Sequence, residues 1–138
     1  YLYIGKNRVR VEYVTPTKIL IILDKDKAMY YNYDLDEDEF FNPKNSSAWF
    51  FFDIFRNPSF FEDGFSYLES NSIILKKDGV YNDETYSLNL FFENNPLILK
   101  KIKFNYGDTK LNLSIFNHKY DQSFEDRFFK LINPSLLN

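Results

Sequence analysis

The sequence predicts a mainly β fold, an antiparallel sheet of many strands, and three observations support this. Phe, Tyr and Trp make up 20% of the 138 residues while alanine is rare, a composition that favours strands over helices. Several segments alternate apolar and polar residues with a period of two, and turn-forming residues separate them. The chain is long enough for one domain with its own core, so we expect residues 1–138 to form a single domain.

The alternation is clearest near the N-terminus. Residues 8–14, RVRVEYV, place apolar and polar side chains on opposite faces, as in a half-buried antiparallel strand. Pro16 ends this segment, and residues 17–24 follow as a strand that is apolar on both faces. The turn DKDK then leads to a strand over residues 28–34. We therefore expect a meander of hairpins.

The rest of the chain continues the same pattern. The acidic run at residues 34–40 predicts a charged edge strand with its turn, and the tail at residues 124–134 predicts a last short strand ending at Pro134. Further strands are expected at residues 65–70, 72–78, 85–93, 97–106 and 110–117.

Residues 46–56, with the aromatic run SSAWFFFDIF, are the segment with the strongest helix signals. Asn45 or Ser46 can cap its start, and Asn57 before Pro58 ends it, because the residue before a proline is disfavoured in the α region. The apolar side chains cover an arc of roughly 200°, wider than the stripe of roughly 100° that a helix on one sheet needs. We therefore expect this helix to contact two apolar surfaces.

The sequence gives little support to catalytic or metal-binding chemistry. There is no cysteine and one histidine, His118, in a predicted turn, and the acidic run lacks the spacing of a calcium loop. The net charge of −3, with scattered basic residues, gives no argument for nucleic acid. We therefore expect no catalytic residues, no metal, no cofactor and no nucleic-acid partner. On composition alone, aromatics filling a core are favoured over aromatics lining a ligand cavity.

The order of the motifs resembles the periplasmic outer-membrane lipoprotein carrier family (LolA-like). The similarity covers nearly the whole chain, although each motif is short. The family's Asp-Gly turn is Asp24-Lys25 here, and its Thr-Pro pair is Ser47-Ala48. The matching features are the Arg-x-Arg-φ-Glu-Tyr strand at residues 8–13, Pro16, the aliphatic strand at 21–23 before Asp24, Tyr31 and Asp34 at the end of the next strand, and the closing segment 128–134.

The resemblance implies an open, strongly curved antiparallel β-barrel (half-barrel) with a short helical lid segment around residues 46–56. The family's N-terminal helix and first strand would lie before Tyr1. The implied function is that of a non-enzymatic, monomeric carrier in the periplasm of a Gram-negative bacterium. It would bind lipoprotein acyl chains in a hydrophobic cavity and shuttle lipoproteins from the inner to the outer membrane. Its partners would be acylated lipoproteins, an inner-membrane lipoprotein-releasing ABC transporter complex and an outer-membrane acceptor.

The resemblance also implies roles for individual residues. Lys6 and Arg8 are the candidates for a basic residue that gates the lid. Three alternatives stay open: an outer-membrane acceptor of the same fold, a cell-envelope scaffold or sensor with a filled core, and an enzyme on a closed β-barrel. The expected acyl-chain cavity is lined by Val9, Val11, Tyr13, Ile19, Ile21, Leu23, Met29, Tyr31, Trp49, Phe51, Phe52 and Phe55.

Overall fold

The computed structural model describes residues 1–48, 54 and 57–137. The elements found in these residues are ten β-strands and four short 3₁₀ helices, so the predicted mainly β class is confirmed. The chain forms two compact units, one of Tyr1–Pro58 with Gln122–Asn138 and one of Ser59–Asp121. Each unit is described by itself below, and the single domain over residues 1–138 stays a prediction.

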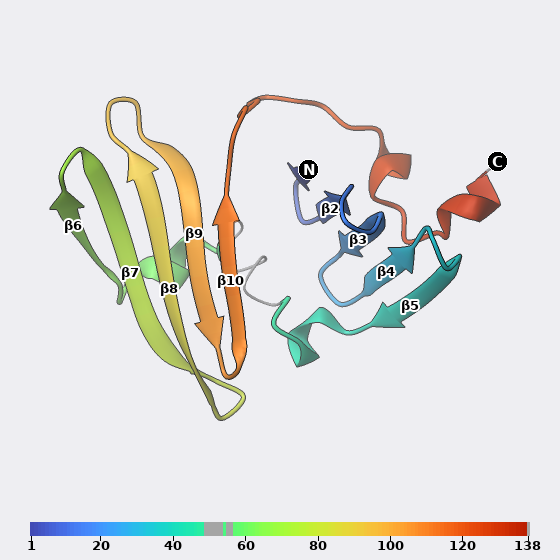
Figure 1. Ribbon diagram of the computed structural model, residues 1–138, viewed down its shortest axis with the longest axis horizontal. Helices are drawn as coiled ribbons and strands as arrows, with labels where there is room; N and C mark the ends of the chain where they lie inside the picture. The colour runs from blue at the N-terminus through green and yellow to red at the C-terminus, as the bar shows by residue number, and fades with distance from the viewer. Residues whose placement is uncertain (49–53, 55–56, 138) are drawn as a thin grey trace. The chain divides into compact units, whose positions relative to one another are not determined.

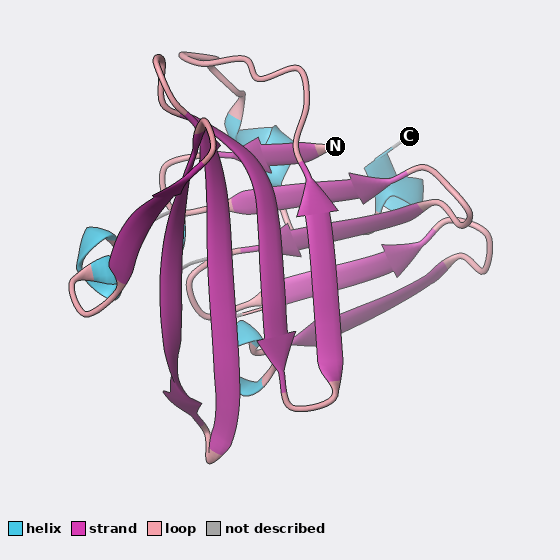
Figure 2. Ribbon diagram, turned by 60° about the vertical axis from the view of Figure 1, so that its left-hand side comes forward, coloured by secondary structure: helices cyan, strands magenta, loops and turns pink. Residues whose placement is uncertain are grey.

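The first unit contains a five-stranded antiparallel meander, as the hairpin pattern predicted (Figure 2). The last strand is the charged edge strand that the acidic run predicted, and its side chains are largely exposed. Carboxylates on an edge strand disfavour pairing with another chain. The strands, in sheet order, are β1 (Leu2–Ile4), β2 (Val9–Tyr13), β3 (Ile19–Leu23), β4 (Ala28–Asn32) and β5 (Glu37–Phe41).

The second unit contains a second antiparallel meander with longer strands (Figure 1). Its ladder has a bulge: Phe91 pairs with Lys101, but Phe92 pairs with Leu99, which leaves Lys100 unmatched. The strands are β6 (Phe65–Glu69), β7 (Ser72–Tyr81), β8 (Glu84–Glu93), β9 (Ile98–Tyr106) and β10 (Thr109–Ser114).

The prediction of one strongly curved half-barrel is wrong for these sheets, because neither is closed or strongly curled. Among the described residues, β5 and β6 do not pair, so the strands divide into two meanders. The chain between them carries the 3₁₀ helices η1 (Pro43–Asn45) and η2 (Pro58–Phe61). Proline has no N–H to donate to a ladder, so Pro43 and Pro58 are unsuited to the interior of a paired strand.

The first sheet is apolar on both faces. One face, here the strap face, carries a cluster of buried side chains that includes Leu20, Ile22 and Met29. The other, here the valine face, carries Val9, Val11, Ile21, Leu23 and Ala28. A sheet of this kind needs a cover on each side, because exposed apolar area costs roughly 25 cal/mol per Å².

The cover of the strap face comes from the far end of the chain, residues 124–131. Phe129 is buried in the cluster, and Phe124, Phe128 and Leu131 pack against it. The predicted last strand is therefore wrong: the tail forms the 3₁₀ helices η3 (Asp126–Phe129) and η4 (Pro134–Leu137). The segment places its rings on the face of the sheet, where a strand would have paired with an edge. We call residues 124–131 the strap.

Two arginines at the start of the chain hold the strap. Arg10 donates from Nη1 to the carbonyl oxygen of Phe128 at 2.7 Å, and its guanidinium lies 4.4 Å from the centre of that ring. Arg10 also donates from Nε to the Glu12 carboxylate at 2.7 Å. Arg8 forms a weaker contact, a 3.0 Å ion pair with Asp126, whose side chain is 90% exposed.

Most of the core of the second unit lies on one face of its sheet, where Leu88, Ile102 and Phe104 are almost fully buried. Ile74, 2% exposed, projects from the opposite face beside Phe91. Phe60 of η2 packs near the first of these faces and stacks on Tyr86. Lys77 anchors η2, because its ammonium group donates to the Phe60 carbonyl and lies 3.9 Å from the centre of the Phe60 ring.

Replacing Arg10 with methionine is expected to release the strap. The change removes a charged hydrogen bond to a part-buried carbonyl and leaves Glu12 without its partner, so the free energy of unfolding should fall by about 2 to 3 kcal/mol. Urea denaturation measures the fall, and limited proteolysis should cut faster within residues 124–131. Arg8→Met is the matched control and should cost less than about 1 kcal/mol, because its carboxylate partner is exposed. An equal fall in the free energy of unfolding for the two variants would contradict the view that Arg10 is the main anchor of the strap.

Asp63 makes the stability of the second unit depend on acid pH. A hydrogen bond from Lys77, at 2.9 Å, lowers the pKa of the Asp63 carboxyl. A lowered pKa stabilises the fold above the unfolded-state value of about 4, and this contribution is lost as the pH falls through the folded-state pKa.

We therefore expect Asp63→Asn to be less stable than the parent at pH 7, with a difference that shrinks below about pH 4. Thermal unfolding followed by circular dichroism across this range measures the difference. Glu62→Gln is the neighbouring control and should not reproduce it. A difference that stays constant down to pH 2 would show that the Asp63 charge is not the cause.

Candidate functional site

The valine face is the surface that gathers the predicted site residues. The register pairs Val9 with Leu23, Val11 with Ile21 and Tyr13 with Ile19. Residues paired in an antiparallel ladder project from the same face. The six strand residues predicted on β2 and β3 therefore form one apolar surface, and its role as the lining of an acyl-chain cavity stays a prediction.

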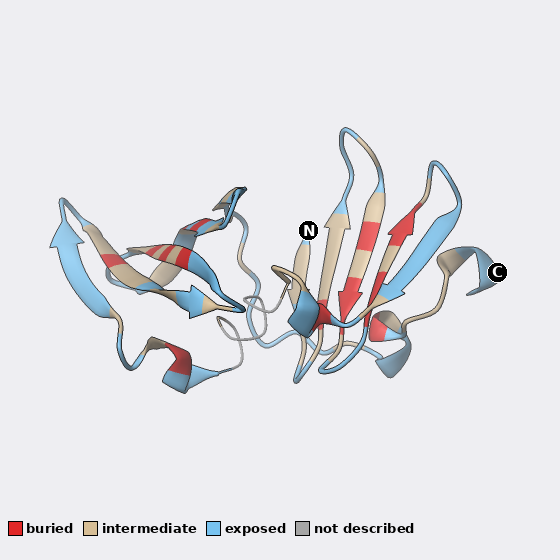
Figure 3. Cartoon of the chain, turned by 90° about the horizontal axis from the view of Figure 1, so that it is seen from below, coloured by how far each residue is buried: buried red, intermediate tan, exposed pale blue. Residues whose placement is uncertain are grey.

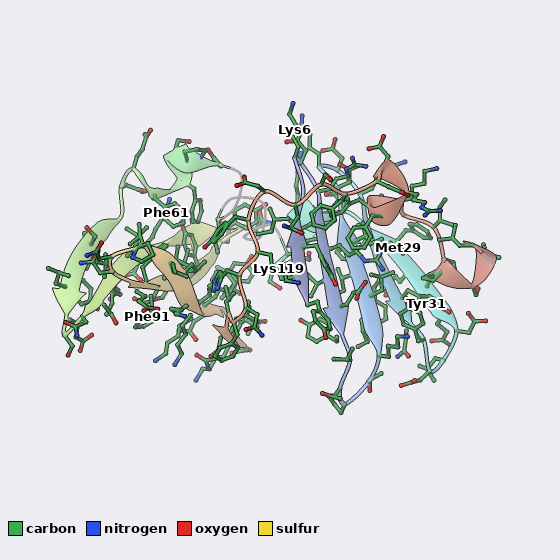
Figure 4. All side chains as sticks on the ribbon, turned by 90° about the horizontal axis from the view of Figure 1, so that it is seen from above. Lys6, Met29, Tyr31, Phe61, Phe91 and Lys119 are labelled. Carbon is green, nitrogen blue, oxygen red and sulfur yellow. The ribbon has the colours of Figure 1, made fainter. Side chains whose placement is uncertain are left out.

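Met29 and Tyr31 do not belong to this surface, so the predicted continuation of the face into β4 is wrong. Met29 pairs with Ile22 and Tyr31 with Leu20, which places both on the strap face, in the cluster of Phe129 (Figure 4). The reason is the hairpin loop. Four residues, 24–27, separate Leu23 from its partner Ala28, so the odd-numbered face of β3 continues on the even-numbered residues of β4.

Burial varies along the valine face (Figure 3). Val9, Leu23 and Ala28 are fully buried, while Val11, Ile21 and Ile19 are half-buried. At the end of the face Tyr13 is 43% exposed. Leu2, Phe41 and Ala48 pack around the buried end. The surface is thus covered at one end and accessible at the other.

Ala48, which packs at this buried end, is the last described residue before the aromatic run of the predicted helix. Ser46 has an extended backbone, and its hydroxyl oxygen accepts a hydrogen bond from the N–H of Ala48 at 3.3 Å. A capping serine makes this bond at the start of a helix, and the capping role of Ser46 stays a prediction. The helix itself stays a prediction, because the remaining site residues lie outside the described residues: Trp49, Phe51, Phe52 and Phe55.

The two lid-gating candidates lie near the start of β2. Lys6 is exposed in the turn between β1 and β2 (Figure 4). Arg8 contacts the strap, through Asp126 and through the Phe129 ring, whose centre lies 5.3 Å from the guanidinium carbon. These contacts of Arg8 are to the C-terminal strap, and lid gating by either residue stays a prediction.

The residues of the valine face that were missing from the predicted set include Leu2, Ala28 and Phe41. Ala28 and Phe41 lie opposite each other across β4 and β5, in line with Leu23. The even number of residues in the 24–27 loop is the sequence signal that would have placed Ala28. Leu2 lies on the short strand β1, where three residues are too few for an alternation to be recognised.

The described residues also include an acidic depression on the β4–β5 hairpin, lined by Tyr30 and residues 36–39. Beside it, the Tyr31 hydroxyl donates to Asp36 at 2.7 Å, which raises the pKa of Tyr31. Within the described ranges, no three carboxylate or histidine side chains are grouped so that they could hold a metal ion. His118 lies with Nε2 2.6 Å from the carbonyl oxygen of Leu99, a contact that fixes a loop on the second sheet.

No protein-family model matches the chain, and no curated protein is significantly similar to it in sequence. In the part of the chain that the structure describes, no helix has the length and apolar character needed to cross a bilayer.

The two faces of the first sheet should respond differently to truncation. Met29→Ala leaves a cavity in a fully buried cluster and should lower the free energy of unfolding by about 2 to 5 kcal/mol. Val11→Ala removes less volume from a half-buried position and should cost less than about 1.5 kcal/mol. Urea denaturation of both variants gives the comparison. A larger loss for Val11→Ala would show that the valine face, and not the strap face, holds the tighter core.

Proposed function

We propose that the protein is a non-enzymatic periplasmic carrier that binds the acyl chains of lipoproteins and shuttles them from the inner to the outer membrane. The observation that carries the proposal is the valine face. Six residues of the predicted cavity share one apolar surface, and that surface is half-buried at its centre and exposed at Tyr13. It thus offers apolar area to a ligand without first unfolding the sheet.

The chemistry of the surface suits an alkyl chain. Its centre consists of aliphatic side chains, and the carboxylates that share this face, Glu37 and Glu39, lie on the edge strand β5. Burial of an alkyl chain contributes about 0.8 kcal/mol per methylene group and needs no directed polar contact. Two or three chains are therefore held tightly by area alone, whatever protein they are attached to.

Such a carrier also needs a cover that opens for release. We assign this role to the helical lid around residues 46–56, with Trp49, Phe51, Phe52 and Phe55 toward the ligand. The support is local: Ala48 packs at the buried end of the valine face, and the aromatic run follows directly. The wide apolar arc predicted for this helix gives it one side for the sheet and another for the acyl chains. Loading from an inner-membrane ABC transporter and delivery to an outer-membrane acceptor complete the proposal.

A cell-envelope scaffold or sensor with a filled core is the second candidate. The observation that favours it is the full burial of Val9, Leu23 and Ala28. A face that is filled along its whole length would hold no ligand, and the two functions therefore differ in a measurable property.

The test is copurification. The full-length protein, secreted in a lipoprotein-producing bacterium and isolated without detergent, should carry acylated protein that mass spectrometry identifies by its lipid-modified N-terminal peptides. Phe52→Asp should reduce the bound lipoprotein at least tenfold, because a carboxylate in the lid opposes burial of alkyl chains. Circular dichroism should show that the variant keeps its β-structure.

Phe40→Asp is the matched control. Phe40 is 57% exposed on the edge strand and pairs with Met29, so it lies on the strap face, and the variant should retain its cargo. Parent protein that never acquires lipoprotein would overturn the carrier proposal. Global unfolding of Phe52→Asp would favour the filled-core scaffold.

A further inference from the structure

The second sheet has an unusual face on the side opposite its apolar core. Figure 4 shows Phe61 and Phe91 on opposite sides of this sheet, Phe61 near the core and Phe91 on the other face. The ladder places seven basic and aromatic residues on the Phe91 side, in three adjacent rows. We call this surface the lysine face, and the seven residues are Phe65, Tyr67, Lys76, Phe91, Lys101, Lys103 and Lys110.

The lysine face is positively charged although the chain as a whole carries a net charge of −3. Its three rows hold four lysines and one carboxylate, Asp78, which lies 3.6 Å from Lys76. The row at the end of the face carries two further carboxylates, Glu69 and Glu93, and Glu93 pairs with Lys100 at the bulge. No carboxylate of the described residues forms an ion pair with Lys101, Lys103 or Lys110. These ammonium groups are therefore available to an anionic surface.

Exposed aromatic rings lie beside the lysines. Phe65 is 58% exposed and Tyr67 42% exposed, and their rings stack on β6 with centres 6.0 Å apart. Phe91 is half-buried in the same face, with the ammonium groups of Lys101 and Lys103 at 6.0 and 5.5 Å from its ring centre. Adjacent exposed rings on an edge strand are unfavourable in water, so this arrangement indicates a contact surface.

We propose that the lysine face docks the protein on the surface of an anionic lipid bilayer. Lysine ammonium groups are attracted to anionic headgroups, and Phe and Tyr partition into the headgroup region. The sheet is not strongly curled, so the lysines and the rings meet a flat target together. A single-stranded nucleic acid is instead bound in a charged groove. The docking uses no residue of the valine face and does not depend on the carrier function.

Sedimentation with vesicles tests the docking. The full-length protein should bind phosphatidylcholine vesicles that contain about one third phosphatidylglycerol and should not bind pure phosphatidylcholine; high salt should release it, because salt screens charges at this distance. Each lysine near an anionic surface contributes about fivefold to the partition coefficient, so Lys101→Gln/Lys103→Gln should lower it about 25-fold. Phe65→Ser/Tyr67→Ser should also weaken binding.

The matched control is Lys6→Gln/Lys25→Gln, which makes the same change in net charge at exposed turn positions of the first sheet and should alter binding less than about twofold. All these positions are exposed or half-buried, so the variants should keep the circular dichroism of the parent. No binding to the anionic vesicles, equal binding to both kinds of vesicle, or equal loss in the two lysine pairs would overturn the proposal. Tighter binding of a single-stranded oligonucleotide, lost in Lys101→Gln/Lys103→Gln, would assign the face to nucleic acid instead.

Discussion

The contact between Arg10 and the Phe128 carbonyl is the interaction on which the first unit depends. It joins residues 118 positions apart, at the two ends of the chain, across a sheet that is apolar on both faces. The strap brings aromatic rings to the strap face, but it also brings backbone groups that need partners. Arg10 satisfies one of them, stacks on the ring of the same residue and is neutralised by Glu12. Because the strap follows the second sheet in the sequence, the strap face stays uncovered until residues 124–131 are available.

The strap also determines which surface is left for a ligand. It occupies the face of Leu20, Met29 and Tyr31, so the valine face is the apolar surface of this sheet that the strap leaves uncovered. This division rests on the four-residue loop at 24–27. Because the loop has an even number of residues, the face that carries odd-numbered residues on β3 carries even-numbered residues on β4. A loop one residue shorter would pair Leu23 with Lys27 and Ile21 with Met29, and would thus exchange the two faces of β4. The shape of the candidate site is therefore fixed by hairpin geometry as much as by the apolar pattern.

Much of the β-structure could be predicted from sequence because strand alternation is a local property. The segments at residues 8–14 and 97–106 became β2 and β9, and the acidic run became the edge strand β5. Three features depend on distant contacts or geometry and could not be predicted this way. The tail became a strap because Phe128 and Phe129 pack on a cluster that is distant in sequence. The curvature of a sheet depends on strand stagger, which the pattern does not encode. The face on which Met29 lies depends on whether the 24–27 loop has an even or an odd number of residues.

The lysine face follows from the same alternation and explains why net charge is a poor guide here. In β9, Ile102 and Phe104 are buried, so the period of two places Lys101 and Lys103 together on the opposite side. The bulge leaves Lys100 without a partner in the ladder, and its side chain forms an ion pair with Glu93. A chain-wide sum of −3 averages these lysines with the carboxylates of β5, which belong to another sheet. The charge that a ligand meets is the charge of one face of one sheet. A protein of negative net charge can therefore carry a surface that attracts anions.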